Sequence, residues 1–306
     1  MKTLYFDEIE NWTEPTVLVL GYFDGLHRGH QALFAEAKKL AAVLNLKIAV
    51  LTFPEKPTLT FQKFEPDMLL KLTSDKKREA LFAENGVDYL VFKDFTSSFA
   101  KQTAEEFSKN VVEKFLPKIV ITGFDHKTGS DMTQLKSNDQ YKVVVIPEVA
   151  DDEGKISSTR IRELVKTGDI EAANELLGYP YETTGIVVHG FARGRTIGYP
   201  TANLAIKDFI HLPSTGVYTV DVLWEGQRQR GFASIGYNET FNGKEKTVEI
   251  HIFDKDLDLY GENLTVLWLD KIREMIKFDS IEALIVQMKD DEEKARQYKV
   301  KKPNFD

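Results

Sequence analysis

An apolar run, Thr16–Leu20, ends abruptly in the turn sequence Gly21-Tyr22-Phe23-Asp24-Gly25-Leu26-His27-Arg28-Gly29-His30. A helical pattern starts at Gln31, so a buried strand is followed by a glycine-broken turn and then by the first turn of a helix. Backbone N–H groups and the helix dipole at such a position favour an anionic ligand. Two histidines three residues apart are often only surface residues of a turn. The strand before them and the helix after them favour a ligand site instead.

The first half of the chain, up to about residue 178, alternates short apolar strands with amphipathic helices. Strands separated by helices predict βαβ units and a parallel sheet of the Rossmann-like α/β class, with ligands bound beyond the carboxyl ends of the strands. The turn Gly21–His30 follows the first expected strand and therefore belongs to that edge. The expected strands are Val17–Leu20, Ile48–Phe53, Tyr89–Phe92, Ile119–Thr122 and Val143–Ile146, and the expected helices are His30–Leu44, Lys76–Asn85 and Ala104–Phe115.

The second half has a different pattern, which begins after Leu176–Pro180. Its short β-branched or aromatic segments, divided by Gly, Asn and Asp, predict an antiparallel β-barrel. A closing helix is expected over Ile281–Tyr298, and its acidic run Asp290–Glu293 is expected to be a solvated surface. The chain is therefore expected to form two domains, residues 1–180 and 181–306. The expected barrel strands lie around Gly185–His189, Val217–Leu223, Gly231–Ile235, Thr247–Phe253 and Leu264–Leu269.

Composition excludes several classes of function. The chain has 306 residues and no cysteine, which excludes disulfides, thiolate metal sites and a cysteine nucleophile. A formal charge of −8 argues against a nucleic-acid partner, because phosphate neutralisation needs clustered Lys and Arg. The segment Met1–Glu8 lacks the apolar core of a signal peptide, and no run reaches the ~18 apolar residues that span a bilayer. We expect a cytoplasmic protein with no membrane partner.

A second candidate phosphate site is the segment Lys155-Ile156-Ser157-Ser158-Thr159-Arg160-Ile161-Arg162, which precedes a helical pattern. Ser and Thr at a helix start cap free N–H groups, and this alone would explain them. Hydroxyls and guanidiniums at a helix N-terminus also suit a phosphate. Together with Gly21–His30 the phosphate interpretation is favoured. Asp24 is a candidate ligand for Mg²⁺ or a ribose hydroxyl, or else a turn-forming residue beside Gly25.

A third candidate site is Gly190–Asn203, where Gly190, Gly194 and Gly198 recur every four residues after an expected strand. Glycine lets the backbone approach phosphates closely, although a glycine series alone is often only a loop. The hydroxyl of Thr201 and the amide oxygen of Asn203 suit a Mg²⁺ ion that bridges phosphates. Glu249, on the polar face of an expected strand, is the candidate general base; the alternative is a solvent-facing strand glutamate.

These stretches together resemble the bifunctional riboflavin kinase/FAD synthetase family of bacteria, over essentially the whole chain. The resemblance rests on the motifs above, with Ser234–Asn238, Val248–Ile252 and Ile272–Phe278 among its further matches. It implies that the barrel phosphorylates riboflavin to FMN, and that the α/β domain adenylylates FMN to FAD and releases pyrophosphate. Both steps would use Mg²⁺ and ATP. No covalent enzyme intermediate is needed, because preorganised donors can stabilise charge on the phosphoryl oxygens.

The residues carried over from this resemblance fall into four sets. The catalytic residues are His27, His30, Arg162 and Glu249; the ATP-binding residues are Gly21, Phe23, Asp24, Gly29, Ser157, Ser158, Thr159, Gly190, Gly194, Gly198 and Thr201; the flavin-binding residues are Asp125, Asn238, Arg273 and Phe278; and the metal ligands are Thr201 and Asn203.

The sequence also departs from the family pattern. In Gly123–Gly129, His126 and Thr128 replace an expected aromatic pair, and Phe53–Pro57 lacks an expected histidine. Two alternatives therefore stay open: a riboflavin kinase whose first domain is silent or altered in flavin preference, and a flavin-binding regulator without turnover. The oligomeric state, direct transfer of FMN between sites and any dependence on reduced flavin are also left open.

Overall fold

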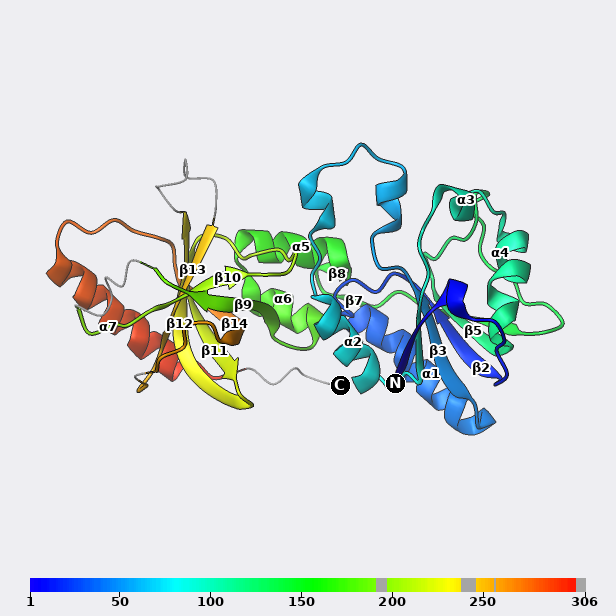
Figure 1. Cartoon of the computed structure of the whole chain (residues 1–306), viewed down its shortest axis with the longest axis horizontal. Helices are drawn as coiled ribbons and strands as arrows, with labels where there is room; N and C mark the ends of the chain where they lie inside the picture. The colour runs from blue at the N-terminus through cyan, green and yellow to red at the C-terminus, as the bar shows by residue number, and fades with distance from the viewer. Residues whose placement is uncertain (191–196, 238–245, 256, 301–306) are drawn as a thin grey trace. The chain divides into compact units, whose positions relative to one another are not determined.

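The structure is a computed structural model that describes residues 1–190, 197–237, 246–255 and 257–300. The chain forms two compact units, Met1–Ser158 and Thr159–Asp306 (Figure 1). The boundary between the two units follows Ser158, whereas the sequence predicted a boundary at residue 180. The two helices that lie between these positions belong to the second unit. Of the candidate site residues, Gly194 and Asn238 lie outside the described residues. No helix of the described residues is long and apolar enough to cross a membrane.

The first unit is built on a six-stranded sheet in the order β1-β4-β3-β2-β5-β6, in which every neighbouring pair is parallel. This confirms the predicted parallel α/β class. The strand order changes direction at β2 and β5, and such a switch point is where ligands bind in open α/β sheets. The strands are β1 (Lys2–Tyr5), β2 (Thr16–Leu20), β3 (Lys47–Thr52), β4 (Tyr89–Phe92), β5 (Pro117–Gly123) and β6 (Lys142–Ile146).

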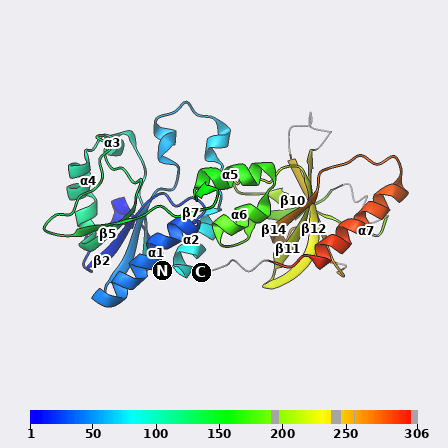
Figure 2. The ribbon, with the colours of Figure 1, turned by 180° about the vertical axis from the view of Figure 1, so that it is seen from behind.

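Helices cover both faces of this sheet, and its central strands are therefore apolar along their whole length. Helix α1 (Arg28–Leu44) packs on β2, β3 and β5, and the reverse view in Figure 2 shows it lying along the sheet. The other face packs on a cluster that includes Phe99, Phe107 and Phe115. The remaining elements are α2 (Asp75–Glu84), α3 (Ser97–Ala100), α4 (Ala104–Asn110), the 3₁₀ helices Phe6–Glu8, Pro57–Thr60, Pro66–Leu69 and Val112–Phe115, and the small hairpin β7 (Ala150–Asp151) and β8 (Gly154–Lys155).

Two expectations for the first unit were wrong in detail. Strand β1 was not predicted, because a short edge strand with mostly exposed side chains has no apolar run. The single helix expected over Ala104–Phe115 is broken at Val111, whose φ of −123° and ψ of −61° interrupt the helical backbone. A 3₁₀ turn continues to Phe115, so the last turn is tighter than the sequence pattern implies.

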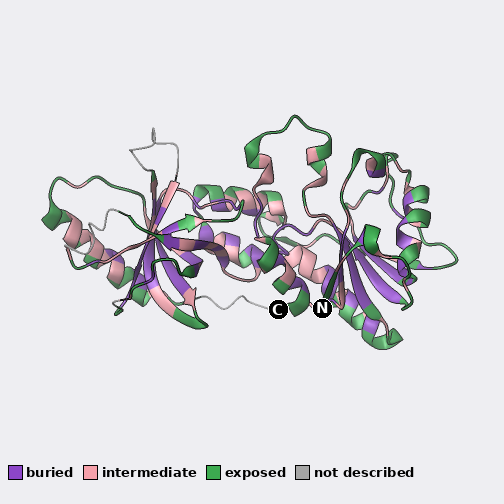
Figure 3. Cartoon of the chain, viewed as in Figure 1, coloured by how far each residue is buried: buried purple, intermediate pink, exposed green. Residues whose placement is uncertain are grey.

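The second unit is a closed six-stranded barrel in the order β10-β13-β12-β11-β14-β9, with antiparallel neighbours throughout. This confirms the predicted barrel, although β10 was not expected. Buried side chains follow the strands (Figure 3), and the fully buried Trp268 donates from its indole to the Thr183 hydroxyl at 3.1 Å. The elements are α5 (Ser158–Thr167), α6 (Ile170–Leu177), β9 (Tyr181–Val188), β10 (Ala202–Ile206), β11 (Gly216–Trp224), β12 (Gln227–Tyr237), β13 (Lys246–Ile252), β14 (Asn263–Arg273) and α7 (Ile281–Gln297).

The closing helix α7 packs against the outer face of β11, β12 and β14, and its predicted acidic surface needs correction. Asp291 is only 1% exposed and accepts hydrogen bonds from Arg273 Nε at 2.9 Å and Nη2 at 2.6 Å. Gln287 donates to the same carboxylate at 3.0 Å. One carboxylate of the acidic run therefore faces the barrel, where a fork of guanidinium donors compensates its burial.

Replacing Asp291 with alanine should strongly destabilise the barrel unit. Removing one partner of a buried ion pair leaves the other charge uncompensated, which costs about 3–5 kcal/mol. The free energy of unfolding is measured in urea from tryptophan fluorescence, which reports mainly on the barrel because Trp224 and Trp268 lie there. Asp290→Ala is the matched control, since its exposed pair with Lys294 is screened by solvent. Equal effects of the two substitutions would contradict this role for Asp291.

Candidate active sites

The turn that joins β2 to α1 is almost completely buried. Phe23 and Asp24 are 2% and 3% exposed, and Phe23 adopts a left-handed backbone with φ of 60°. Non-glycine residues in this region are strained, and such strain is concentrated at functional sites. A Cβ on Gly21 would lie 2.6 Å from the Phe23 ring, so only glycine allows the ring to fold back beneath the strand end.

The two histidines of the turn stack on each other, with ring centroids 3.7 Å apart and planes inclined by 20°. His30 also meets the Phe23 ring edge-on at 5.2 Å. His30 Nδ1 is buried and has no hydrogen-bond partner within the described part of the chain. Burial, and then the neighbouring His27, Arg78 and Lys155, hold the pKa of His30 well below its usual value. The imidazole is therefore neutral at pH 7, with a ring nitrogen left to serve a ligand.

Asp24 has a structural role in this turn. Its Oδ1 accepts a hydrogen bond from Leu72 N at 2.8 Å, and its carbonyl oxygen accepts one from the Ser158 hydroxyl at 2.8 Å. Ser158 is the first residue of α5, so its hydroxyl joins the His-containing turn to the start of the second predicted phosphate segment. These contacts support the turn-forming alternative for Asp24.

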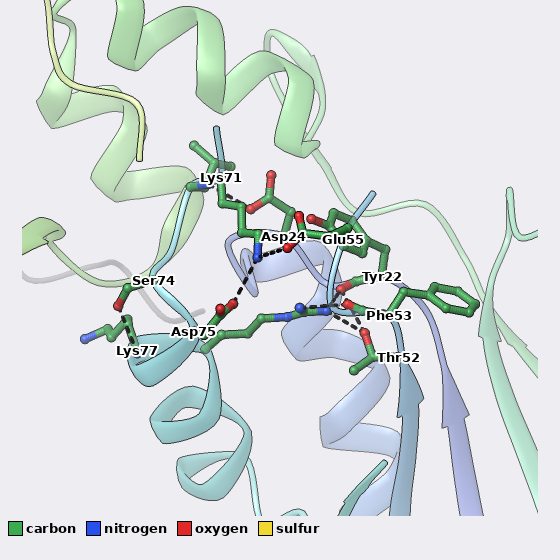
Figure 4. A network of polar contacts seen from close by, with 11 residues as sticks. Tyr22, Asp24, Thr52, Phe53, Glu55, Lys71, Ser74, Asp75 and Lys77 are labelled. Carbon is green, nitrogen blue, oxygen red and sulfur yellow. Dashed lines mark hydrogen bonds and ion pairs between the residues drawn. The ribbon is translucent and has the colours of Figure 1, made fainter. Parts of the chain in front are cut away.

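A buried arginine that the sequence analysis missed holds the carboxyl ends of β2 and β3 together (Figure 4). Arg78 of α2 is 2% exposed; its Nη1 donates to Phe53 O at 2.9 Å, and its Nη2 donates to Tyr22 O. Nη2 also donates to Thr52 Oγ1 at 2.5 Å. The helical spacing could have revealed this residue, because Arg78 shares a helix face with buried Leu81 and Phe82.

The segment Phe53–Pro57 lacks the expected histidine and is fixed by two polar residues of its own, Glu55 and Lys56. Glu55 contacts Lys71 Nζ at 3.1 Å, as Asp75 of α2 also does (Figure 4), and Lys56 Nζ donates to Leu70 O at 3.1 Å. Because Asp24 binds the next backbone N–H, at Leu72, these contacts tie three chain segments together beside the turn.

The second departure from the family pattern lies after β5, at the same sheet edge. Asp125 forms an ion pair with Lys155 and is not buried, while Lys155 also lies 4.6 Å from the Phe124 ring centroid. His126 Nε2 and Thr128 Oγ1 are buried without a hydrogen-bond partner among the residues described. Polar atoms therefore occupy the positions where an aromatic pair was expected.

Of the predicted residues in this segment, Ser157 precedes helix α5, whereas Thr159 and Arg162 belong to that helix. Thr159 and Arg162 group with the second unit, so their contact with a nucleotide at the histidines stays a prediction.

The second site lies on the outer face of the barrel. Val248 and Ile250 are each 1% exposed and face the interior, so Glu249 lies on the opposite face of β13 with Thr247 and His251, as the alternation predicts. The strand register sets Asn203 of β10 directly opposite Glu249. Thr201, just before β10, donates to Glu249 Oε2 at 3.4 Å.

Three features border this polar group. A Cβ on Gly190 would overlap the Asn203 amide, so the end of β9 can approach only because it is glycine. Gly198 has a left-handed backbone with φ of 85°, which favours glycine there. A pocket beside Thr201 is lined by Val187, Ile250, Ile252, Lys255, Leu257, Leu259 and Tyr260 among others.

The flavin candidates Arg273 and Phe278 lie near one another, with the guanidinium 5.7 Å from the ring centroid. Because Arg273 is held by Asp291, its guanidinium serves first to fix α7. The sequence could not show this partner, since Asp291 belongs to a run of four acidic residues with no visible pattern.

The stability of the first unit should fall as the pH falls below about 6.5. In this range His30 binds a proton in the unfolded state but stays neutral in the folded state, where its pKa is lowered. A lowered folded pKa means that the stabilisation is complete above the unfolded pKa and is lost on acidification, by at most about 1.4 kcal/mol per pH unit for one proton. Unfolding followed by circular dichroism from pH 7.5 to 5 should show a smaller slope for His30→Asn. Burial also lowers the pKa of His126, so some slope should remain. An unchanged slope would contradict the neutral state of His30.

Comparisons with known proteins agree with the geometry of both units. Residues 9–160 match the family described as FAD synthetase, and residues 177–299 match the riboflavin kinase family. The chain is 36% identical to the bifunctional riboflavin kinase/FMN adenylyltransferase of Listeria monocytogenes, over 97% of this chain and 98% of the relative. It is 33% identical to the protein of that name from Bacillus subtilis, with the same coverage.

Among solved structures, one entitled "Macrolide-efflux Protein from Streptococcus pneumoniae" is 44% identical, with a TM-score of 0.93, and the match covers 97% of this chain and 99% of that one. With both halves matched in order and the relatives covered almost completely, this chain belongs to the bifunctional riboflavin kinase/FMN adenylyltransferase family.

Proposed function

We propose that this chain converts riboflavin to FAD in two ATP-dependent steps, each carried by one part of the chain. Residues 181–306 phosphorylate riboflavin to FMN, and residues 1–180 adenylylate FMN. The observation that carries this proposal is the presence of two separate polar groups, the stacked histidines after β2 and the Glu249 group on β13. Because ATP is produced in the cytoplasm, the chain is expected to act there, on small-molecule substrates.

In the first unit, a phosphate oxygen of FMN attacks the α-phosphorus of ATP and the bond to pyrophosphate breaks. His27 and His30 lie at the start of α1, where N–H groups and the helix dipole favour phosphate. The buried, unpartnered Nδ1 of His30 supports a role in which the imidazoles hold phosphoryl oxygens. Preorganised donors of this kind stabilise the charge that develops in the transition state.

In the barrel, Glu249 accepts the proton of the terminal ribityl hydroxyl of riboflavin. The hydroxyl oxygen then attacks the γ-phosphorus of ATP, and ADP leaves. The outward position of Glu249 makes its carboxylate accessible to a substrate hydroxyl, which a general base requires. The pocket beside Thr201 suits the adenine ring, since aliphatic side chains such as Ile250 and Leu259 can pack on the faces of a flat base.

The Thr201 hydroxyl and the Asn203 amide oxygen fit a Mg²⁺ site, because hard oxygen donors lie together beside Glu249. A bound Mg²⁺ ion would neutralise charge on the phosphates of ATP. Gly190 supports this placement, since its missing side chain leaves the Asn203 amide beside the glycine-rich segment where phosphates would lie.

An alternative is a kinase whose first unit no longer adenylylates FMN. The polar atoms of His126 and Thr128, buried where an aromatic pair was expected, favour this alternative. Against it, the His-containing turn is complete and fully packed. FMN that accumulates without FAD, when riboflavin and ATP are supplied, would support the alternative.

Substitutions should separate the two reactions. Glu249→Gln should lower FMN formation by about 10²–10⁴-fold, the usual contribution of a positioned general base, and leave FAD formation from supplied FMN unchanged. His30→Asn should do the reverse, with about a 10²–10³-fold loss of FAD formation, because a preorganised donor is removed. Both rates are measured by chromatography of the flavin products from the full-length chain.

Each variant serves as the control for the other, because the reaction that it retains shows that the unaltered unit is folded, and circular dichroism of each variant checks the folding of the altered unit. Loss of both reactions in either folded variant would contradict the assignment of two sites. Chelation of divalent cations should stop both reactions, and turnover that persists without them would contradict the Mg²⁺ proposal.

A further inference from the structure

A serine on β12, which belongs to the motif Ser234–Asn238 but has no role assigned above, lies directly beside the proposed base. The strand register places Ser234 opposite Glu249, as it places Asn203 opposite Glu249 on the other side. Three polar side chains therefore form one row across β10, β13 and β12, which are neighbours in the barrel (Figure 1). Opposed side chains of adjacent strands have Cβ atoms about 4.5–5.5 Å apart, so Glu249 lies within reach of both neighbours.

Burial shows that Ser234 points outward with Glu249. Its chain neighbours Ala233 and Ile235 are both fully buried in the barrel, whereas Ser234 is half-buried. The Ser234 hydroxyl has no hydrogen bond among the described residues. A polar group in such a position is available to a ligand that lies over the strand.

The two ends of the row differ in chemistry. On the β10 side lie the oxygens of Thr201 and Asn203, beside Gly190 and the pocket proposed for adenine. On the β12 side lies an apolar side chain, since Met275 Cε is 3.8 Å from the Cβ position of Gly236. Met275 and the following Ile276 are 47% and 45% exposed, although both are large apolar side chains. With the pocket on the β10 side proposed for adenine, these exposed apolar side chains on the β12 side are a surface that the flavin ring can cover.

Riboflavin has a similar order of groups along its length: a flat ring with an apolar dimethylbenzene end, a chain of secondary hydroxyls, and the terminal hydroxyl that is phosphorylated. With that terminal hydroxyl at Glu249 and the ring toward Met275, the hydroxyl-bearing chain passes over Ser234. We propose that Ser234 is a specificity-determining residue that hydrogen-bonds a secondary hydroxyl of the ribityl chain. This inference rests on the proposed kinase function of the barrel.

The test compares two substrates of the full-length chain: riboflavin, and a flavin whose ribityl group is replaced by a hydroxypentyl chain. The second substrate keeps the terminal hydroxyl and lacks the secondary ones. Ser234→Ala should lower kcat/KM for riboflavin about 3- to 10-fold, mainly through KM, which corresponds to one neutral hydrogen bond. It should leave kcat/KM for the hydroxypentyl flavin unchanged. Thr265→Ala is the matched control, since it removes another half-buried barrel hydroxyl, which contacts Thr184 at 3.1 Å on β9.

Equal losses on both substrates would overturn the inference, because Ser234 would then act through Glu249 or through the strand. An unchanged kcat/KM for riboflavin would overturn it as well. If the unaltered protein phosphorylates neither substrate, the kinase function itself is contradicted, and the inference about Ser234 is contradicted together with it.

Discussion

Both candidate sites of this chain lie where closely packed apolar strands end or expose one face to solvent. In the first unit helices cover both faces of the sheet, so the candidate site lies at the carboxyl edge of its strands. The turn Gly21–His27 occupies that edge and has Phe23 packed beneath it. In the second unit the barrel interior is filled, so only the outer face can carry Glu249. These are the two regions where we place the phosphate chemistry.

Both sites also depend on glycine at a point of close approach. Gly21 allows the Phe23 ring to fold under the strand end, and Gly190 allows β9 to end against the Asn203 amide. The charged residues around the first site act differently from those of the second. Arg78 donates to carbonyl oxygens at the ends of β2 and β3 and so holds the turn, whereas Glu249 accepts a hydrogen bond from Thr201 and faces outward, where a substrate hydroxyl can reach it.

Sequence patterns predicted the central strands, the barrel and the outward face of Glu249, because buried strands leave apolar runs and alternation. They missed β1 and β10, whose side chains are mostly not buried and leave no such run. They also missed the burial of Asp291. The sequence of an acidic run does not show whether one of its carboxylates forms an ion pair with an arginine of a distant strand, as Asp291 does with Arg273. Motifs named the candidate site residues, but contacts that join distant segments, such as Asp24 with Leu72, depend on the fold.

The central claim is that the chain cleaves ATP at two different phosphorus atoms. Supplying riboflavin with ATP labelled at either the γ- or the α-phosphorus tests this most directly, with the flavin products separated and counted. We expect the γ-label in FMN and in FAD, and the α-label in FAD alone, with unlabelled pyrophosphate released from α-labelled ATP. An α-label in FMN, or FAD that carries neither label, would contradict the account.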